Sequence, residues 1–375
     1  MTLNTTPLQL GYFFSLVLWI LLLSRGFKQQ RLSDKMLGWI MLILAIELQD
    51  YTFGFAGINI LWEQFNGFPR DVSLLLGPTM YLYFRSQVNR MFKFEKIHIW
   101  HFMPYFVYFL YCIVFFVQGP EAVVRQQDSV TELILGYVYH IFLVVSYIFY
   151  SIKCLSIYRA YRVWSLQQFS NLEIISFKWF RNFVYSMILW LVFREFMGVL
   201  DSYLNLSFYE DWWWNLALAA VAFYIGLIGY SQIQPSKINF DQSNRSNNKK
   251  NENQEFNENS IESKKSEIAL KLKEAMEQER LYLQPDLNLH ELAQHIQTNA
   301  VELSATINQV FKQNFNDYIN NLRIEAFIEL FQNEAYKSYT MLSIAYDSGF
   351  NSKATFNRSF KKIKGMSPKE YFEKR

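Results

Sequence analysis

The chain has 375 residues, enough for two or three domains; charged residues make up 18% of it and its formal net charge is +3. Only two cysteines occur, Cys112 and Cys154, which excludes a disulfide framework and a zinc site built on thiolates. The averages describe no single part of the chain, because it is apolar and aromatic up to about residue 233, polar over 236–265, and of ordinary soluble composition from 266 onwards.

Seven segments of the apolar region approach the length of about 20 residues that a membrane-spanning helix needs. They are 8–24, 36–55, 71–86, 97–117, 133–154, 180–200 and 212–233. The third is short and contains Gly77-Pro78. A large soluble core is the alternative, but helices of soluble proteins carry a polar stripe. The segment "HFMPYFVYFLYCIVFFV" has none. The pattern therefore predicts a seven-helix transmembrane bundle.

The connections between these segments differ in their basic residues. Thirteen Lys and Arg lie in the first, third and fifth connections, and two, Arg70 and Arg125, lie in the second and fourth. Cytoplasmic loops carry the excess of basic residues. We therefore expect the N-terminus outside the cell and everything after residue 233 in the cytoplasm.

Five ionisable residues fall at similar depth in the outer half of the predicted bundle. They are Glu47, Asp50, His140, Arg194 and Glu195. Charges at membrane depth are costly and usually face the bundle interior. Two compatible interpretations follow: a structural ion pair of Arg194 with Asp50 or Glu47, and a ligand pocket open to the outside.

Signatures of common enzymes are missing, including the P-loop, the dinucleotide fingerprint, G-x-S-x-G, H-E-x-x-H and the kinase motifs. His98 and His101 form an H-x-x-H pattern without further ligands. The sequence predicts no enzyme, no catalytic residue, no cofactor and no metal site.

Residues 236–265 contain many Asn and few apolar residues, so they cannot offset their ordering entropy and are predicted to be a disordered linker. A flexible tether transmits proximity better than torque. It would also permit proteolytic release of 236–375.

After the linker, two short helix pairs are predicted on either side of a long helix, "NDYINNLRIEAFIELFQN". The first pair is "LNLHELAQHI" and "AVELSATINQVFKQNF", and the second is "TMLSIAYDSG" and "KATFNRSFKKIKG". A plain helical bundle would also keep their apolar spacing, but it has no need for the basic residues at the end. Helix-turn-helix pairs place their second helix in the major groove of DNA.

Residues 266–375 resemble the DNA-binding domain of AraC/XylS-type transcription regulators. The similar residues are "LHELA", "LSATIN", "NFNDYINNLRIEAF" and "SIAYDSGFNSKATFNRSFKKIKGMSPKEYF". The resemblance implies two helix-turn-helix units joined by one helix. The whole arrangement also resembles AraC-type regulators with a multi-helix membrane domain from Bacteroidetes-like bacteria, which implies a bacterial inner membrane.

The first unit departs from the family's pattern. It has Glu302 and Ala305 where the family usually has basic residues, and Gln297 where a turn glycine is expected. Residues 281–334 hold two basic and seven acidic residues, a net charge of −5, whereas 353–375 hold eight basic and two acidic residues, a net charge of +6. Phosphate contacts supply most of the affinity for DNA. The second unit is therefore predicted to supply most of the DNA binding.

Short polar and Arg side chains on the second recognition helix can reach base edges. The base-edge candidates there are Ser352, Lys353, Thr355, Asn357 and Arg358, and the phosphate candidates are Lys361, Lys362 and Lys364. Weaker candidates in the first unit are Ser304, Thr306, Asn308 and Gln309.

The sequence thus predicts an all-α chain: a seven-span membrane sensor domain over 1–235, a disordered linker over 236–265, and a cytoplasmic double helix-turn-helix domain over 266–375. The predicted function is a membrane-anchored transcription regulator. The alternative is a transporter or membrane enzyme with an appended regulatory DNA-binding domain. Candidate partners are double-stranded promoter DNA, the lipid bilayer, an unidentified ligand or protein at the membrane domain, and a second copy of the chain in a homodimer.

Overall fold

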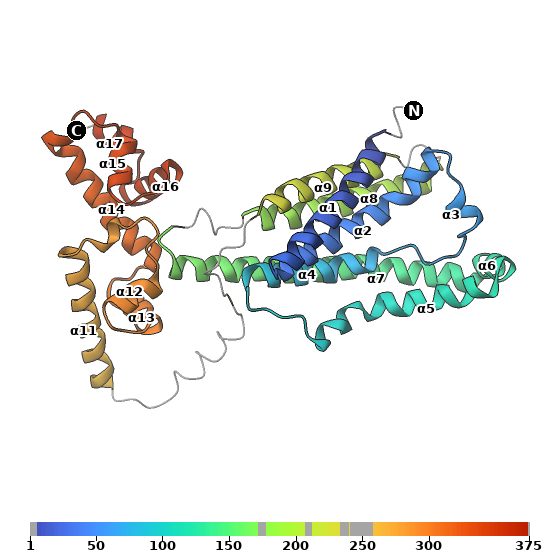
Figure 1. The fold of residues 1–375 in the computed structure, drawn as a ribbon, viewed down its shortest axis with the longest axis horizontal. Helices are drawn as coiled ribbons and strands as arrows, with labels where there is room; N and C mark the ends of the chain where they lie inside the picture. The colour runs from blue at the N-terminus through green and yellow to red at the C-terminus, as the bar shows by residue number, and fades with distance from the viewer. Residues whose placement is uncertain (1–5, 172–177, 207–211, 233–239, 241–257, 374–375) are drawn as a thin grey trace. The chain divides into compact units, whose positions relative to one another are not determined.

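The computed structural model describes residues 6–171, 178–206, 212–232, 240 and 258–373, and Figure 1 shows its helices. Within these ranges the chain contains no strand, and the predicted all-α class is confirmed. The chain divides into two compact units, residues 1–158 with 178–241 and residues 159–177 with 242–375.

The first unit is built from long apolar helices, several of which lie side by side in Figure 1. Its described elements are α1 (Thr6–Lys28), α2 (Leu32–Phe55), α3 (Ile60–Glu63), α4 (Ser73–Val88), the 3₁₀ helix η1 (Lys96–Phe102), α5 (Met103–Gln118), α6 (Pro120–Gln127), most of α7 (Val130–Gln168), α8 (Lys178–Leu204) and α9 (Trp212–Ser231).

Six of the described helices are long and apolar enough to cross a membrane: α1, α2, η1 with α5, α7, α8 and α9. The third predicted span corresponds to α4, which has 16 residues. At 1.5 Å per residue it reaches about 24 Å, less than the roughly 30 Å of a bilayer's hydrocarbon core. Thirteen of its sixteen residues are buried, which makes α4 a core helix of this unit.

Other helices expose apolar side chains instead of burying them. Helix α5 has no buried residue and a strongly apolar sequence, with Val107, Leu110 and Val117 more than 60% exposed. Helix α7 adds the exposed residues Leu133, Tyr137 and Ile141. Exposed apolar surface of this extent is rare on soluble monomers and marks contact with a membrane or another protein.

The second unit is a set of shorter helices. After the end of α7 come α11 (Glu258–Glu277), η2 (Leu281–Leu283), α12 (Leu289–His295), α13 (Ala300–Val310), α14 (Phe315–Gln332), η3 (Glu334–Tyr336), α15 (Met341–Asp347), α16 (Lys353–Lys364) and α17 (Pro368–Glu373). One hydrophobic cluster joins α11, α12 and α13, and another joins α15, α16 and α17. Helix α14 supplies Phe315 and Ile319 to the first cluster and Ile324 and Phe327 to the second, so it connects both halves.

The segment after α7 belongs to this second unit and is held by buried polar contacts. Ser170, with no exposed surface, donates its Oγ hydrogen to the Leu287 carbonyl at 2.6 Å. Asn316 Nδ2 donates to the carbonyls of Phe169 at 3.1 Å and Ser170 at 2.7 Å. Arg323 Nη2 donates to Ser170 Oγ at 3.2 Å. The prediction of three consecutive regions missed this segment, because nothing in its composition separates it from the preceding span.

Part of the predicted linker is structured. Residues 258–265 are the start of α11, and Phe240 is buried, with its N–H donating to the Val88 carbonyl at 3.0 Å. Residues 236–239 and 241–257 lie outside the described residues. The C-terminal boundary predicted at 265 was therefore too late, because "ENSIESKK" continues the charged helix that follows it.

Candidate nucleic-acid interface and membrane-domain pocket

The first helix-turn-helix unit consists of α12 and α13. Asn288 caps α12 by accepting a hydrogen bond from the Glu291 N–H at 3.0 Å, and Asn299 caps α13 through the Glu302 N–H at 2.8 Å. Gln297 lies in the turn between them with φ of 56°, the left-handed region that favours glycine. The position that the family resemblance assigns to glycine thus keeps the glycine conformation while carrying a side chain.

The second unit consists of α15 and α16 and repeats this construction. Thr340 caps α15 and Ser352 caps α16, each accepting from a backbone N–H at 3.1 Å. Gly349 occupies the turn with φ of 90°. A Cβ added there would lie 2.7 Å from the Tyr282 carbonyl oxygen. Glycine is required at this position both by the conformation and by the neighbouring backbone.

Helix α16 presents a basic exposed face. Lys353, Asn357 and Lys361 follow one another at intervals of four residues, and Arg358 lies beside them; all four are exposed. Residues four apart lie on the same side of a helix. Phe350, Phe356 and Phe360 are buried and Tyr371 packs against them. The helix therefore holds its apolar side in the core and leaves its basic side free for DNA.

Four of the predicted contact residues of α16 are placed differently from the prediction. Thr355 is buried, and Ser352 is occupied as the helix cap. Lys362 Nζ lies 2.5 Å from an Asp317 carboxylate oxygen, and Lys364 Nζ lies 2.6 Å from one of Glu325. The prediction treated Thr355 and both lysines as available, whereas the packing against α14 turns Thr355 inward and pairs both lysines with acidic residues.

On α13 the exposed face carries no basic side chain. Ser304 is partly exposed and Asn308 and Gln309 are exposed, but Thr306 has no exposed surface and donates its Oγ1 hydrogen to the Glu302 carbonyl at 2.9 Å. Thr306 is thus a core residue, contrary to the prediction. Glu302 forms an ion pair with Lys264 at 2.6 Å.

Arg323 of α14 is buried and is therefore not available to bind phosphate. Its guanidinium donates to the carbonyls of Tyr282 at 2.7 Å and Gln284 at 2.6 Å. Burial lowers the pKa of Arg323 to about 10, and the nearby Asp286 partly opposes that shift. The side chain remains charged at neutral pH and serves the fold.

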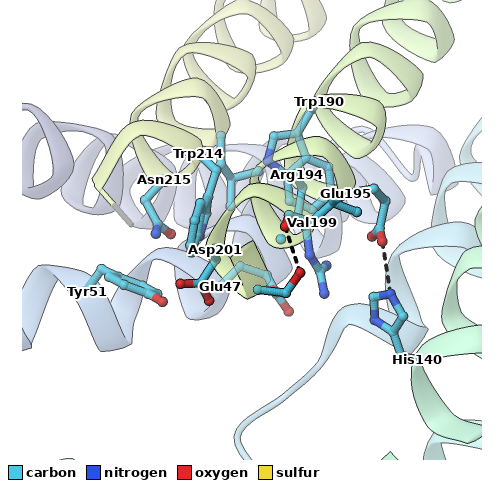
Figure 2. A pocket seen from close by; sticks show the side chains of 13 residues that line it. Glu47, Tyr51, His140, Trp190, Arg194, Glu195, Val199, Asp201, Trp214 and Asn215 are labelled. Atoms are coloured by element: carbon cyan, nitrogen blue, oxygen red, sulfur yellow. Dashed lines mark hydrogen bonds and ion pairs between the residues drawn. The ribbon is translucent and has the colours of Figure 1, made fainter. Parts of the chain in front are cut away.

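In the compact unit of long apolar helices, four of the five predicted ionisable residues line one pocket of about 610 Å³. Glu47 comes from α2, His140 from α7, and Arg194 and Glu195 from α8. Figure 2 shows Tyr51 and Asn215 on one side and the hydrogen-bonded His140 and Glu195 on the other, with Glu47 and Arg194 between them. The His140 Nε2 to Glu195 Oε2 distance is 2.9 Å.

Asp50, the fifth predicted residue, does not line this pocket. Its carboxylate pairs with Arg70 at 3.3 Å, in a neighbouring pocket of about 380 Å³ that Glu47 also lines. Glu47 accepts a hydrogen bond from Ser73 Oγ at 2.8 Å. Among the described residues, neither Asp50 nor Glu47 forms the ion pair with Arg194 that the sequence suggested. Arg70 had been counted only as a loop residue, so its role as the partner was missed.

Sequence reasoning also missed several lining residues of the larger pocket. They include Tyr51, Trp190, Asp201, Trp214 and Asn215. The predicted cluster included only ionisable residues deep in each span. Asp201 falls one residue beyond the predicted sixth span, and aromatic residues are so common here that none of them stands out.

Comparisons with known proteins concern the C-terminal region. Residues 292–374 match a family described as a helix-turn-helix domain. Uncharacterized HTH-type transcriptional regulators of Staphylococcus aureus strains COL, MSSA476 and N315 are each 33% identical to the chain over 92 residues. That segment is 24% of this chain and 12% of each relative, so the similarity covers a minor part of both. No solved structure matches the chain.

Proposed function

The C-terminal region is a helix-turn-helix domain of the AraC type, and from this premise we propose that the chain is a membrane-anchored transcription regulator. It binds promoter DNA through its C-terminal compact unit and receives a signal through its unit of long apolar helices. The membrane is the inner membrane of a bacterium.

The exposed basic face of α16 is the observation that carries the DNA-binding part of the proposal. Lys353, Asn357, Arg358 and Lys361 lie on one side of the second helix of a helix-turn-helix pair. In such pairs this helix enters the major groove, where Arg and Asn read base edges and Lys meets phosphates. We assign Arg358 and Asn357 to bases and Lys361 to phosphate.

The apolar surface of the first unit supports the membrane anchor. Six helices have the length and composition to span a bilayer, and α5 has no buried residue and exposes several large apolar side chains. In water such a surface would drive aggregation, whereas hydrocarbon solvates it. The distribution of basic residues between the connections orients the anchor with the DNA-binding domain in the cytoplasm.

Immunoprecipitation of the chain from its host, combined with transcript profiling, tests the central claim. We expect the full chain to occupy a small set of promoters whose transcripts change when the chain is absent. Arg358→Ala should lower occupancy of these promoters while leaving the amount of membrane-bound protein unchanged. Normal occupancy in that variant, or altered solute transport with unchanged transcripts, would favour the transporter alternative.

Reporter fusions test the anchor and its orientation. Fusions after Gln30, Arg90 and Ser165 should report the cytoplasm, and fusions after Gly67, Gln126 and Tyr209 the outside. The change of side between Gly67 and Arg90 requires the short, buried helix α4 to cross the bilayer as a seventh span. The pair Gln126 and Ser165 is decisive because most of the long apolar helix α7 lies between them. The orientation fails if both report the same side.

A further inference from the structure

We propose that the pocket lined by α2, α7, α8 and α9 binds a small zwitterion of the amino-acid type, with one ammonium and one carboxylate group. The inference deepens the proposed function, on which it rests, by naming the chemical class of the signal. It is argued from the unpaired polar atoms and charges that line the pocket.

One part of the pocket wall offers hydrogen-bond donors without acceptors. The indole Nε1 of Trp190 has no hydrogen-bond partner although only 4% of the residue is exposed. Arg194 lies four residues further along α8 and, among the described residues, forms no ion pair. Residues four apart share a helix face, and a guanidinium binds carboxylate through parallel N–H donors. Together they make a site for a carboxylate group.

Another part of the wall is rich in carboxylates, one of which has an oxygen without a donor. Glu195 uses Oε2 to bind His140 at 2.9 Å, while its buried Oε1 has no partner. The carboxylates of Glu47 and Asp201 line the same space. A buried acceptor without a donor costs free energy, which an ammonium group on a ligand recovers. This part of the wall therefore suits an ammonium group.

The balance of charge excludes simpler ligands. Among the described residues, the pocket is lined by three carboxyl side chains, one guanidinium and His140, which is bonded to Glu195, so a purely anionic ligand would meet Arg194 but be repelled by the acids. A simple amine would satisfy the acids but leave Arg194 and the Trp190 indole without an acceptor. A molecule with both groups satisfies both parts of the wall.

The remaining wall limits the size and shape of the ligand. Tyr51, Trp214 and Leu218 give it apolar and aromatic surface, which Figure 2 shows for the two aromatic residues. A volume of about 610 Å³ falls within the roughly 300–1,000 Å³ typical of small-molecule sites. An amino acid with a large side chain fits this space.

Binding to the full chain in lipid nanodiscs tests the inference. The probes are the twenty common L-amino acids, screened by thermal shift and then titrated calorimetrically. We expect at least one to bind saturably. Its decarboxylated amine and its deaminated acid should each bind at least about tenfold more weakly. Absence of binding by all probes, or equal affinity for the amine or the acid, would overturn the inference.

Variants of the pocket supply the second arm. Arg194→Gln should weaken the zwitterion at least about tenfold but change the affinity for the decarboxylated amine little. Glu195→Gln should also weaken binding of the zwitterion at least about tenfold but should change the affinity for the deaminated acid little. Arg125→Gln, on α6 and outside the pocket, is the control and should bind normally. Unchanged zwitterion binding in both folded pocket variants would also reject the site.

Because the assay measures binding alone, its failure is distinguishable from failure of the proposed function. Promoter occupancy without amino-acid binding would leave a membrane-anchored regulator with another signal. Amino-acid binding without promoter occupancy would leave the pocket and remove the regulator.

Discussion

The two helix-turn-helix units share one construction and differ in what they expose. Both use polar N-caps, both turn through a residue with positive φ, and both pack against α14. The second helix of one unit exposes Lys353, Arg358 and Lys361, whereas that of the other exposes Val301, Asn308 and Gln309.

The comparison separates folding from DNA binding. The caps and the apolar residues that form each unit lie on the inner side, where both units agree. Electrostatic affinity for DNA depends on the outer side, where they differ by several charges. A unit can therefore keep the helix-turn-helix fold after losing most of its attraction for phosphate.

Arg323→Met should destabilise the domain by about 3–5 kcal/mol, because it leaves the buried carbonyls of Tyr282 and Gln284 without donors. Urea unfolding of the fragment 258–375, measured against the same fragment with Arg323 so that the missing Ser170 contact is common to both, gives this loss. The salt dependence of DNA binding by the remaining folded protein should not change, since the guanidinium is only 1% exposed. A lower salt slope would show that Arg323 contacts phosphate after all.

Gly349→Ala should destabilise the same fragment by about 2–4 kcal/mol, because its conformation is left-handed and its Cβ would collide with the Tyr282 carbonyl. The matched change in the first unit, Gln297→Gly, should stabilise by up to about 1 kcal/mol, since it relieves a strained φ at some cost in unfolded-state entropy. The stability lost in Gly349→Ala should therefore be larger than the stability gained in Gln297→Gly. If Gln297→Gly destabilised strongly, the Gln side chain would have a role that its conformation does not reveal.

The turn positions of the two units were largely predictable from the sequence. The family resemblance located both turns, and the structure gives Gln297 the conformation of the glycine it replaces. The helix pairs and their apolar cores were predictable because periodicity and capping are local. The burial of Thr306 and Thr355 was not, because a polar residue at the edge of an apolar stripe is indistinguishable by composition from an exposed one.

Contacts between distant residues were less predictable still. The pairs Lys362 with Asp317 and Asp50 with Arg70 join residues from different helices, and no local pattern specifies them. The docking of Ser170 beside Leu287 was equally hidden, since these residues are 117 positions apart. The end of helix α7 thus belongs to the DNA-binding unit, which the prediction of three consecutive regions did not include.

Neighbouring residues of α16 should differ in their effect on DNA. Arg358→Ala should cost about 1–3 kcal/mol of binding and relax the sequence preference at one position. Lys361→Ala should weaken binding to all sequences and lower the salt slope by about one unit. Lys362→Ala is the matched control, and its effect should be smaller because its ammonium is paired with Asp317. Titrations of the fragment at two salt concentrations measure all three.

Substitutions on α13, in the first helix-turn-helix unit, are compared with these changes on α16. Ser304→Ala and Asn308→Ala should alter affinity less than Arg358→Ala, and Ala305→Arg should strengthen non-specific binding by adding a phosphate contact. Binding that survives Arg358→Ala with Lys361→Ala but collapses in Asn308→Ala would reverse the assignment of the two units.

The smallest effect concerns the ion pair of Glu302 with Lys264, which lies at the start of α13. The hydrogen bond from Lys264 lowers the pKa of Glu302 below its usual 4.5, opposed by partial burial. A lowered folded-state pKa gives stability that is present above that value and is lost as the pH falls through the folded-state pKa. The pair is mostly exposed, so its coupling energy should be only about 0.2–1 kcal/mol. A double-mutant cycle with Glu302→Gln and Lys264→Gln, measured by urea unfolding at about pH 7 and about pH 3, should show coupling only at the higher pH. Coupling that persists in acid would mean that neutral contacts, not charge, join α11 to the first recognition helix.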